Sequence, residues 1–349
     1  MRKTIQVEFK NPLGIFNLDD FSYLYNDKEL KRIAEDSSLY FILQRPCLIF
    51  RNIKCSTKFL TGEISQPLTG INIKFQLPLY QKDVIETENI SNIELHLCYN
   101  KSLKNKENLN DFIDVIIIKI PKEKNFTKLI TPDTILRSHY NKNWKVNIEG
   151  ETKKLLEFDV KYIGHSVKQF IAKRIKNHSN IQRILTTSLP IQKGMQISKE
   201  LCICLLEIND ILEAKTIIPN DYGSENNSNL LKLPNEESIY YDAEKAYINF
   251  FSKSKNNLLE NKDLYASYPK GTNGLFDEKY ENIIYNIQDE ITLKYGDKEL
   301  NNKNVIYVNR KLKTVEKNNY AQHRVKKLLN YCFHFVHCFL IYYIIIRKV

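Results

Sequence analysis

Short apolar runs separated by turn residues dominate the first 140 positions of the chain. The runs are rich in β-branched and aromatic residues, and Asn11-Pro12, Gly70 and the polar stretch 100–111 interrupt them. Segments of this kind are typical of β-strands, because such side chains pack well on a pleated surface. We expect strands at residues 5–9, 39–43, 47–50, 71–77, 93–99 and 112–120, with one helix at 27–35.

After residue 140 the pattern changes to short strands that alternate with helical segments. Residues 144–148 and 155–163 are predicted to pair as a hairpin around Glu149-Gly150. The other expected elements are helices at 166–178, 180–187 and 236–251, a buried strand at 200–208, and strands at 291–295 and 304–308. The sequence therefore predicts an α+β protein, in which a β-rich N-terminal domain precedes a small α/β domain.

Two of the predicted helices carry a charged residue in the middle of an apolar face. Arg174 lies on such a face in the first helix, and Glu244 lies on one in the helix at 236–251. Asp242, Lys245 and Asn249 are assigned to the polar side of that second helix. Burying an unpaired charge costs several kcal/mol or shifts its pKa. We therefore expect Arg174 and Glu244 either to form a structural ion pair or to border a hydrated active site.

Four segments of this region resemble elements of the GIY-YIG nucleases. Residues 160–166 read V-K-Y-I-G-H-S, 174–178 read R-I-K-N-H, 243–251 read A-E-K-A-Y-I-N-F-F, and 252–256 read S-K-S-K-N. They are similar, in order and approximate spacing, to the family's Tyr-Ile-Gly strand, its Arg helix, its Glu helix and its Asn segment.

The resemblance implies a three-stranded central sheet and a metal-dependent endonuclease. Glu244 would hold Mg²⁺ or Mn²⁺, Arg174 would steady the scissile phosphate, and Tyr162 would position or deprotonate the attacking water. Asn256 would support the site, and His178 would orient water or phosphate unless it is a core histidine. These roles suit phosphodiester hydrolysis, which needs a positioned water and neutralisation of the charge that grows on phosphoryl oxygens.

The family's first element, Gly-Ile-Tyr, has no match on the strand before Tyr-Ile-Gly, where residues 144–148 read W-K-V-N-I. One interpretation is an atypical nuclease in which Tyr162 replaces the missing tyrosine. The other is a catalytically inactive relative that binds nucleic acid without cutting it.

Basic residues concentrate around the Tyr-Ile-Gly segment. The chain has a net charge of +11, and residues 161–199 contain eight basic residues and no acidic residue. The proposed contacts to nucleic acid are Lys161, Lys168, Lys173, Lys176 and Arg183. Such a cluster favours a polyanion, with DNA as the expected partner, although a solvated helix face in a Lys-rich chain would look similar.

The C-terminal residues 328–346 are nearly all apolar and have basic residues on both flanks. Their length is near the lower limit for a membrane span, so a membrane anchor and a packed helix or strand are both open. A membrane-tethered interaction protein is therefore a third functional hypothesis. The seven cysteines show no disulfide or zinc spacing, and the N-terminus lacks a signal peptide, so we expect a cytoplasmic protein with reduced thiols.

These patterns divide the chain into four parts. They are a β-rich module at 1–140, a nuclease-like domain at 141–265, a β-containing extension at 266–325 and the apolar tail at 326–349.

Overall fold

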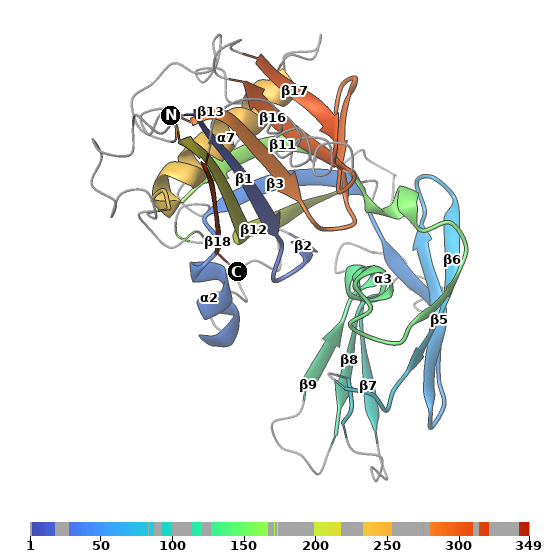
Figure 1. Cartoon of the computed structure of the whole chain (residues 1–349). Coiled ribbons are helices and arrows are strands. Elements are labelled where there is room, and N and C mark those ends of the chain that lie inside the picture. The colour runs from blue at the N-terminus through green and yellow to red at the C-terminus, as the bar shows by residue number, and fades with distance from the viewer. Residues whose placement is uncertain are drawn as a thin grey trace. The chain divides into compact units, whose positions relative to one another are not determined.

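Strands dominate the computed structural model of the chain (Figure 1). The structure describes residues 2–17, 28–82, 84–86, 93–99, 113–120, 127–166, 171, 173, 199–217, 233–252, 275, 280–309, 314–320 and 342–348. Their strands form an 11-stranded mixed sheet and a 7-stranded sheet. The predicted α+β class, with a small α/β domain around three strands, is therefore wrong.

The larger sheet joins strands from distant parts of the chain. Its order is β15-β14-β11-β3-β12-β1-β13-β16-β17, and β2 and β18 both pair with β12. Its strands are β1 (Arg2–Lys10), β2 (Ile15–Asn17), β3 (Leu39–Pro46), β11 (Glu157–His165), β12 (Lys199–Ile217), β13 (Tyr280–Ile287), β14 (Thr292–Tyr295), β15 (Lys298–Asn301), β16 (Asn304–Asn309), β17 (Thr314–Asn319) and β18 (Tyr342–Lys348). β1 pairs antiparallel with β12 and parallel with β13, which makes the sheet mixed.

The smaller sheet is built from the strands between β3 and β11. Its order is β10-β6-β5-β4-β8-β7, and β9 pairs with β8. Its strands are β4 (Ile49–Cys55), β5 (Phe59–Gln66), β6 (Ile71–Pro78), β7 (Glu94–Tyr99), β8 (Ile113–Lys119), β9 (Thr127–Ile130) and β10 (Asn147–Glu149). The predicted hairpin is wrong, because β10 pairs with β6, and β11 lies between β14 and β3. Pairing across a long sequence distance replaces the local pairing that the turn residues suggested.

Among the described residues, two predicted helices are present and one further helix was missed; the helices expected at 166–178 and 180–187 lie largely outside them. α2 (Lys28–Glu35) and α7 (Glu236–Ser252) confirm the helices expected at 27–35 and 236–251. α3 (Pro132–Asn141) lies in the region expected to be β-rich. It begins at a capping box in which Thr131 and Thr134 satisfy each other's backbone N–H groups, and Pro132 occupies the first turn. A 3₁₀ turn, η3 (Lys153–Leu156), precedes β11.

Every residue of α7 from Ile239 to Phe251 except Tyr241 is buried, and Figure 1 shows the helix beside the larger sheet. The ring of Tyr247 contacts Phe9 of β1, Phe41 of β3 and Tyr285 of β13, so this side of the helix covers the larger sheet. The residues assigned to its polar side, Asp242, Lys245 and Asn249, are also buried.

The chain divides into two compact units, each assembled from separate stretches. The first unit contains Met1–Leu43, Phe158–Ile184 and Ile203–Val349, and the second contains Gln44–Glu157 and Leu185–Cys202. These units do not coincide with the linear division at residues 140, 265 and 325.

The end of the apolar tail takes part in the larger sheet. β18 pairs antiparallel with β12, from Ile211↔Lys348 to Ile217↔Tyr342. The preceding residues 321–341 lie outside the described part of the chain. Within the described part, no helix is long and apolar enough to cross a membrane.

Candidate functional site

The Tyr-Ile-Gly segment occupies the end of β11, beside β3. The N–H of Ser166 donates to the carbonyl oxygen of Ser38 at 2.7 Å, which ties the end of this segment to the start of β3. The rings of Tyr40 and Tyr162 stack, with centroids 5.9 Å apart and an interplanar angle of 27°. Both tyrosines are buried, at 0% and 4% exposure.

Gly164 is required by the close approach of these two rings. A Cβ atom at this position would lie 2.5 Å from Cζ and Oη of Tyr40 and 2.7 Å from Cε1 of Tyr162. Contacts this short do not occur in packed proteins, and one ring would have to leave its place. The glycine of the Tyr-Ile-Gly motif therefore has a packing role in this chain.

Sequence reasoning missed Tyr40. The resemblance expects a Gly-Ile-Tyr strand next to the Tyr-Ile-Gly strand, and Ser38-Leu39-Tyr40 stands at the start of the neighbouring strand β3. That element was expected at residues 144–148, which do not pair with β11. The available signal was a small residue followed by Leu-Tyr at the start of the apolar run 39–43.

A histidine–glutamate pair lies at the last residue of β11. Nδ1 of His165 is 2.7 Å from Oε2 of Glu244, which projects from α7. The Glu244 side chain is 7% exposed and the His165 side chain 22% exposed. The carboxylate can accept a hydrogen bond from Nδ1–H, and in the neutral tautomer that makes this bond Nε2 carries the lone pair. The sequence pattern predicted no role for His165, although this residue directly follows Tyr-Ile-Gly.

Two further α7 residues continue this cluster. The ring of Tyr241 contacts the His165 ring edge-to-face, with centroids 5.3 Å apart. Nζ of Lys245 lies 3.9 Å from the centroid of the Tyr241 ring. We call His165, Tyr241, Glu244 and Lys245 the His165 cluster.

The structure brings Glu244 to the Tyr-Ile-Gly corner, where it contacts His165. Alternation along β11 places Tyr162 and His165 on opposite faces of the sheet. Lys161 is half-buried on the His165 face, and Lys173 is exposed. The predicted site residues Arg174, His178, Asn256, Lys168, Lys176 and Arg183 lie outside the described residues.

The His165 cluster offers one carboxylate to a metal ion. No group of three or more His, Cys, Asp or Glu side chains that could hold a metal occurs among the described residues. Mg²⁺ keeps several waters and is commonly bound through one or two carboxylates together with substrate phosphates. Glu244 therefore fits Mg²⁺ or Mn²⁺ as a single protein ligand, not as part of a preformed cage.

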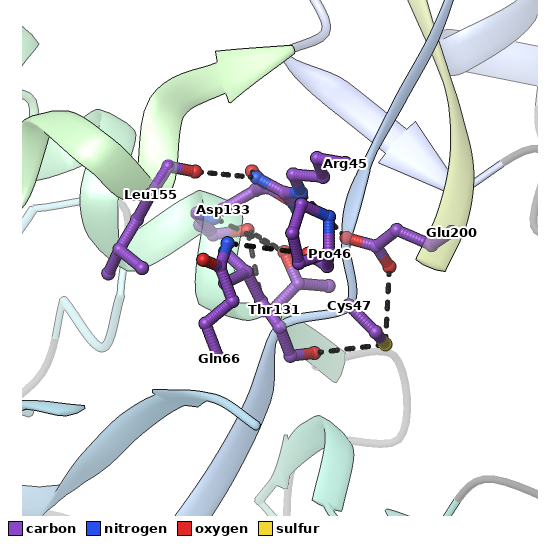
Figure 2. A network of polar contacts seen from close by, with 10 residues as sticks. Arg45, Pro46, Cys47, Gln66, Thr131, Asp133, Leu155 and Glu200 are labelled. Atoms are coloured by element: carbon purple, nitrogen blue, oxygen red, sulfur yellow. Dashed lines mark hydrogen bonds and ion pairs between the residues drawn. The ribbon is translucent and has the colours of Figure 1, made fainter. Parts of the chain in front are cut away.

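A second polar cluster lies in the second unit, around the buried Arg45 (Figure 2). Its guanidinium group makes a bidentate ion pair with Asp133 of α3, with Nη1 at 2.7 Å from Oδ1. Its Nε donates to Oε1 of Glu200 at 2.7 Å, and Nη1 also reaches the carbonyl oxygen of Leu155. One side chain thus joins β3, α3, β12 and the turn before β11.

The pKa shifts of the groups around Arg45 indicate that this cluster has a structural role. Burial raises the pKa of the Cys47 and Cys202 thiols, so they stay protonated and are poor nucleophiles. Burial alone would lower the pKa of Arg45, but the carboxylates of Asp133 and Glu200 raise it well above its ordinary value. Burial also raises the pKa of Glu200, against the opposing effect of Arg45.

Comparison with protein-family models, with curated proteins and with solved structures found no match to the chain. The contacts of the His165 cluster are therefore the only basis for regarding it as a candidate functional site.

We predict that Gly164→Ala lowers the free energy of unfolding by about 1–3 kcal/mol, the range for an overpacked core. The added methyl group collides with the rings of Tyr40 and Tyr162. Urea unfolding of the full chain measures the loss. In a Tyr40→Ala background the same substitution should cost less, and an equal cost in both backgrounds would contradict the packing explanation.

Arg45→Met is expected to destabilise the protein by about 3–5 kcal/mol, because two nearly buried carboxylates lose their cation. Adding Asp133→Asn and Glu200→Gln should recover part of this loss. Lys54→Met is the matched control, since Lys54 is exposed on β4 and should stay within about 0.5 kcal/mol of the parent. A loss below about 1 kcal/mol for Arg45→Met would count against a buried ion-pair network.

The raised pKa of Glu200 makes the stability of the folded protein depend on pH, and the direction of this dependence can be worked out. Its folded pKa is raised above the ordinary 4.5, so the folded chain holds this proton more tightly. The resulting stability is complete below that ordinary value and is lost as the pH rises through the folded pKa. We expect the fall in urea midpoint from pH 5 to pH 8 to be smaller in Glu200→Gln than in the parent. The exposed Glu149→Gln should leave the fall unchanged, and the same fall in Glu200→Gln would refute the assignment.

Proposed function

We propose that this chain hydrolyses phosphodiester bonds in nucleic acid, and that its substrate is DNA. The observation that carries the proposal is the 2.7 Å contact between His165 and Glu244 at the Tyr-Ile-Gly corner. A buried carboxylate that orients a partly exposed imidazole is a common arrangement for a general base. The basic residues of the same segment supply attraction for a polyanion.

His165 is the proposed general base. With Nδ1–H donated to Glu244, the lone pair of Nε2 can accept a proton from a water molecule. The oxygen of that water then forms a bond to phosphorus, and the leaving sugar oxygen departs with the electron pair of the broken bond. The negative charge of Glu244 stabilises the imidazolium, whose proton can pass to the leaving oxygen.

Glu244 would also hold the Mg²⁺ or Mn²⁺ ion that the resemblance implies. When bound, such an ion neutralises charge on the phosphoryl oxygens. Oε2 of Glu244 is engaged by His165, so Oε1 is the atom that remains for a metal. Arg174, from the segment that follows β11, is the proposed second cation for the scissile phosphate.

A second candidate is a nucleic-acid-binding protein without catalysis. Burial of Tyr40 and Tyr162 favours it, because these rings pack against each other in the core. In that case the tyrosines hold the strand pair together, and the basic segment binds the phosphate backbone.

Cleavage of plasmid DNA, single-stranded DNA and RNA with Mg²⁺ or Mn²⁺ tests the proposal. We expect His165→Gln and Glu244→Gln to lower the rate at least about 100-fold, the range for loss of a general base or of its orientation. Arg174→Ala should have an effect of the same order, while urea midpoints remain close to the parent.

Tyr162→Phe separates the two roles considered for Tyr162. It keeps the stacked ring and removes the hydroxyl, so we expect parent-like cleavage. Parent-like cleavage by His165→Gln and Glu244→Gln would contradict the site, and gel-shift binding without cleavage under either metal would favour the second candidate.

A further inference from the structure

Lys245 is a buried cation without an acidic partner among the described residues. It is 6% exposed, and its Nζ faces the ring of Tyr241 at 3.9 Å. The ion pairs of the described residues do not include it, although Glu244 precedes it on α7. Lysines are rarely buried to this extent unless they are paired. Its Nζ is not among the buried side-chain atoms of the described residues that lack a partner, and a cation–π contact leaves the ammonium group its charge, so Nζ can bind an anion.

The position of Lys245 connects it to the proposed reaction centre. The Tyr241 ring contacts both the His165 ring and Nζ of Lys245. An anion bound by Lys245 would therefore lie beside the same aromatic ring as His165. A polynucleotide strand could then place one phosphodiester group at His165 and the next one at Lys245.

We propose that Lys245 binds the phosphodiester group next to the scissile one, with Tyr241 as the spacer between the two positions. The claim about the scissile group rests on the proposed function, whereas the binding of a polynucleotide phosphate by Lys245 does not. Lysine binds phosphate as a point charge, and Lys161 lies on the same face of β11 as His165. Two lysines accompany the single carboxylate of the cluster, and the sequence 161–199 contains eight basic residues and no acidic residue; this charge balance favours a polynucleotide.

Binding of a fluorescent single-stranded DNA oligonucleotide, with EDTA present to prevent cleavage, tests this proposal. We expect Lys245→Met to weaken the Kd about tenfold at low salt and to reduce the slope of log K against log salt by about one, as for loss of one phosphate contact. Lys245→Arg should retain most of the affinity. Lys54→Met is the control, because Lys54 is an exposed lysine of the second unit.

Folding and ligand class need their own controls. Circular dichroism and urea midpoints establish that each variant is folded, and Lys245→Gln replaces Lys245→Met if the latter does not fold. Inorganic phosphate and a mononucleotide should compete weakly, since each occupies one position. Poly-glutamate competing as well as the oligonucleotide would overturn the assignment to nucleic acid.

The outcomes separate this proposal from the proposed function. An unchanged Kd and salt slope in Lys245→Met would overturn the phosphate site, even if Glu244→Gln abolishes cleavage. Lys245-dependent binding by a parent protein that cuts no substrate would support the phosphate site and remove the hydrolytic function. With cleavage present, Lys245→Met should raise KM more than it lowers kcat.

Discussion

The candidate site depends on the backbone pairing of β3 between β11 and β12. These strands come from distant parts of the chain, and their pairing places Tyr40 beside Tyr162 and closes the end of β11 through Ser38 and Ser166. Once β11 is fixed in this position, its last residue meets α7, which is anchored on β1, β3 and β13 by the Tyr247 ring. The contact between His165 and Glu244 follows from these two constraints.

The two faces of β11 contact different kinds of side chain. On one face, the tyrosines and Gly164 form a packed aromatic layer in which a single methyl group has no room. On the other face, the chain buries a carboxylate and an ammonium group beside an imidazole and a phenol ring. Burying charge in this way is costly, and in the second unit the comparable cost at Arg45 is offset by two carboxylates. Among the described residues Lys245 contacts the Tyr241 ring and no carboxylate, so its surroundings differ from those of Arg45.

Local signals in the sequence predicted α2, α7 and many strand positions, because capping, periodicity and β-propensity act over a few residues. The charge in the middle of the predicted apolar face of α7 marked Glu244 as a candidate, and the Glu244 side chain is buried in the structure. The sheet order could not be predicted, because any pair of apolar strands can satisfy the same local pattern. The role of Tyr40 was missed for that reason, and the burial of Lys245 was missed because α7 has structure on all sides.

The interleaved course of the chain has a consequence for its biosynthesis. β1 borders β12 and β13, and β12 also borders β18. During synthesis, the N-terminal strand emerges from the ribosome long before residues 280–287 exist to pair with it. Non-local pairing of this kind slows folding and leaves strand edges open to wrong partners. The nascent chain therefore keeps its first strand without one of its two neighbours until most of the protein has been synthesised.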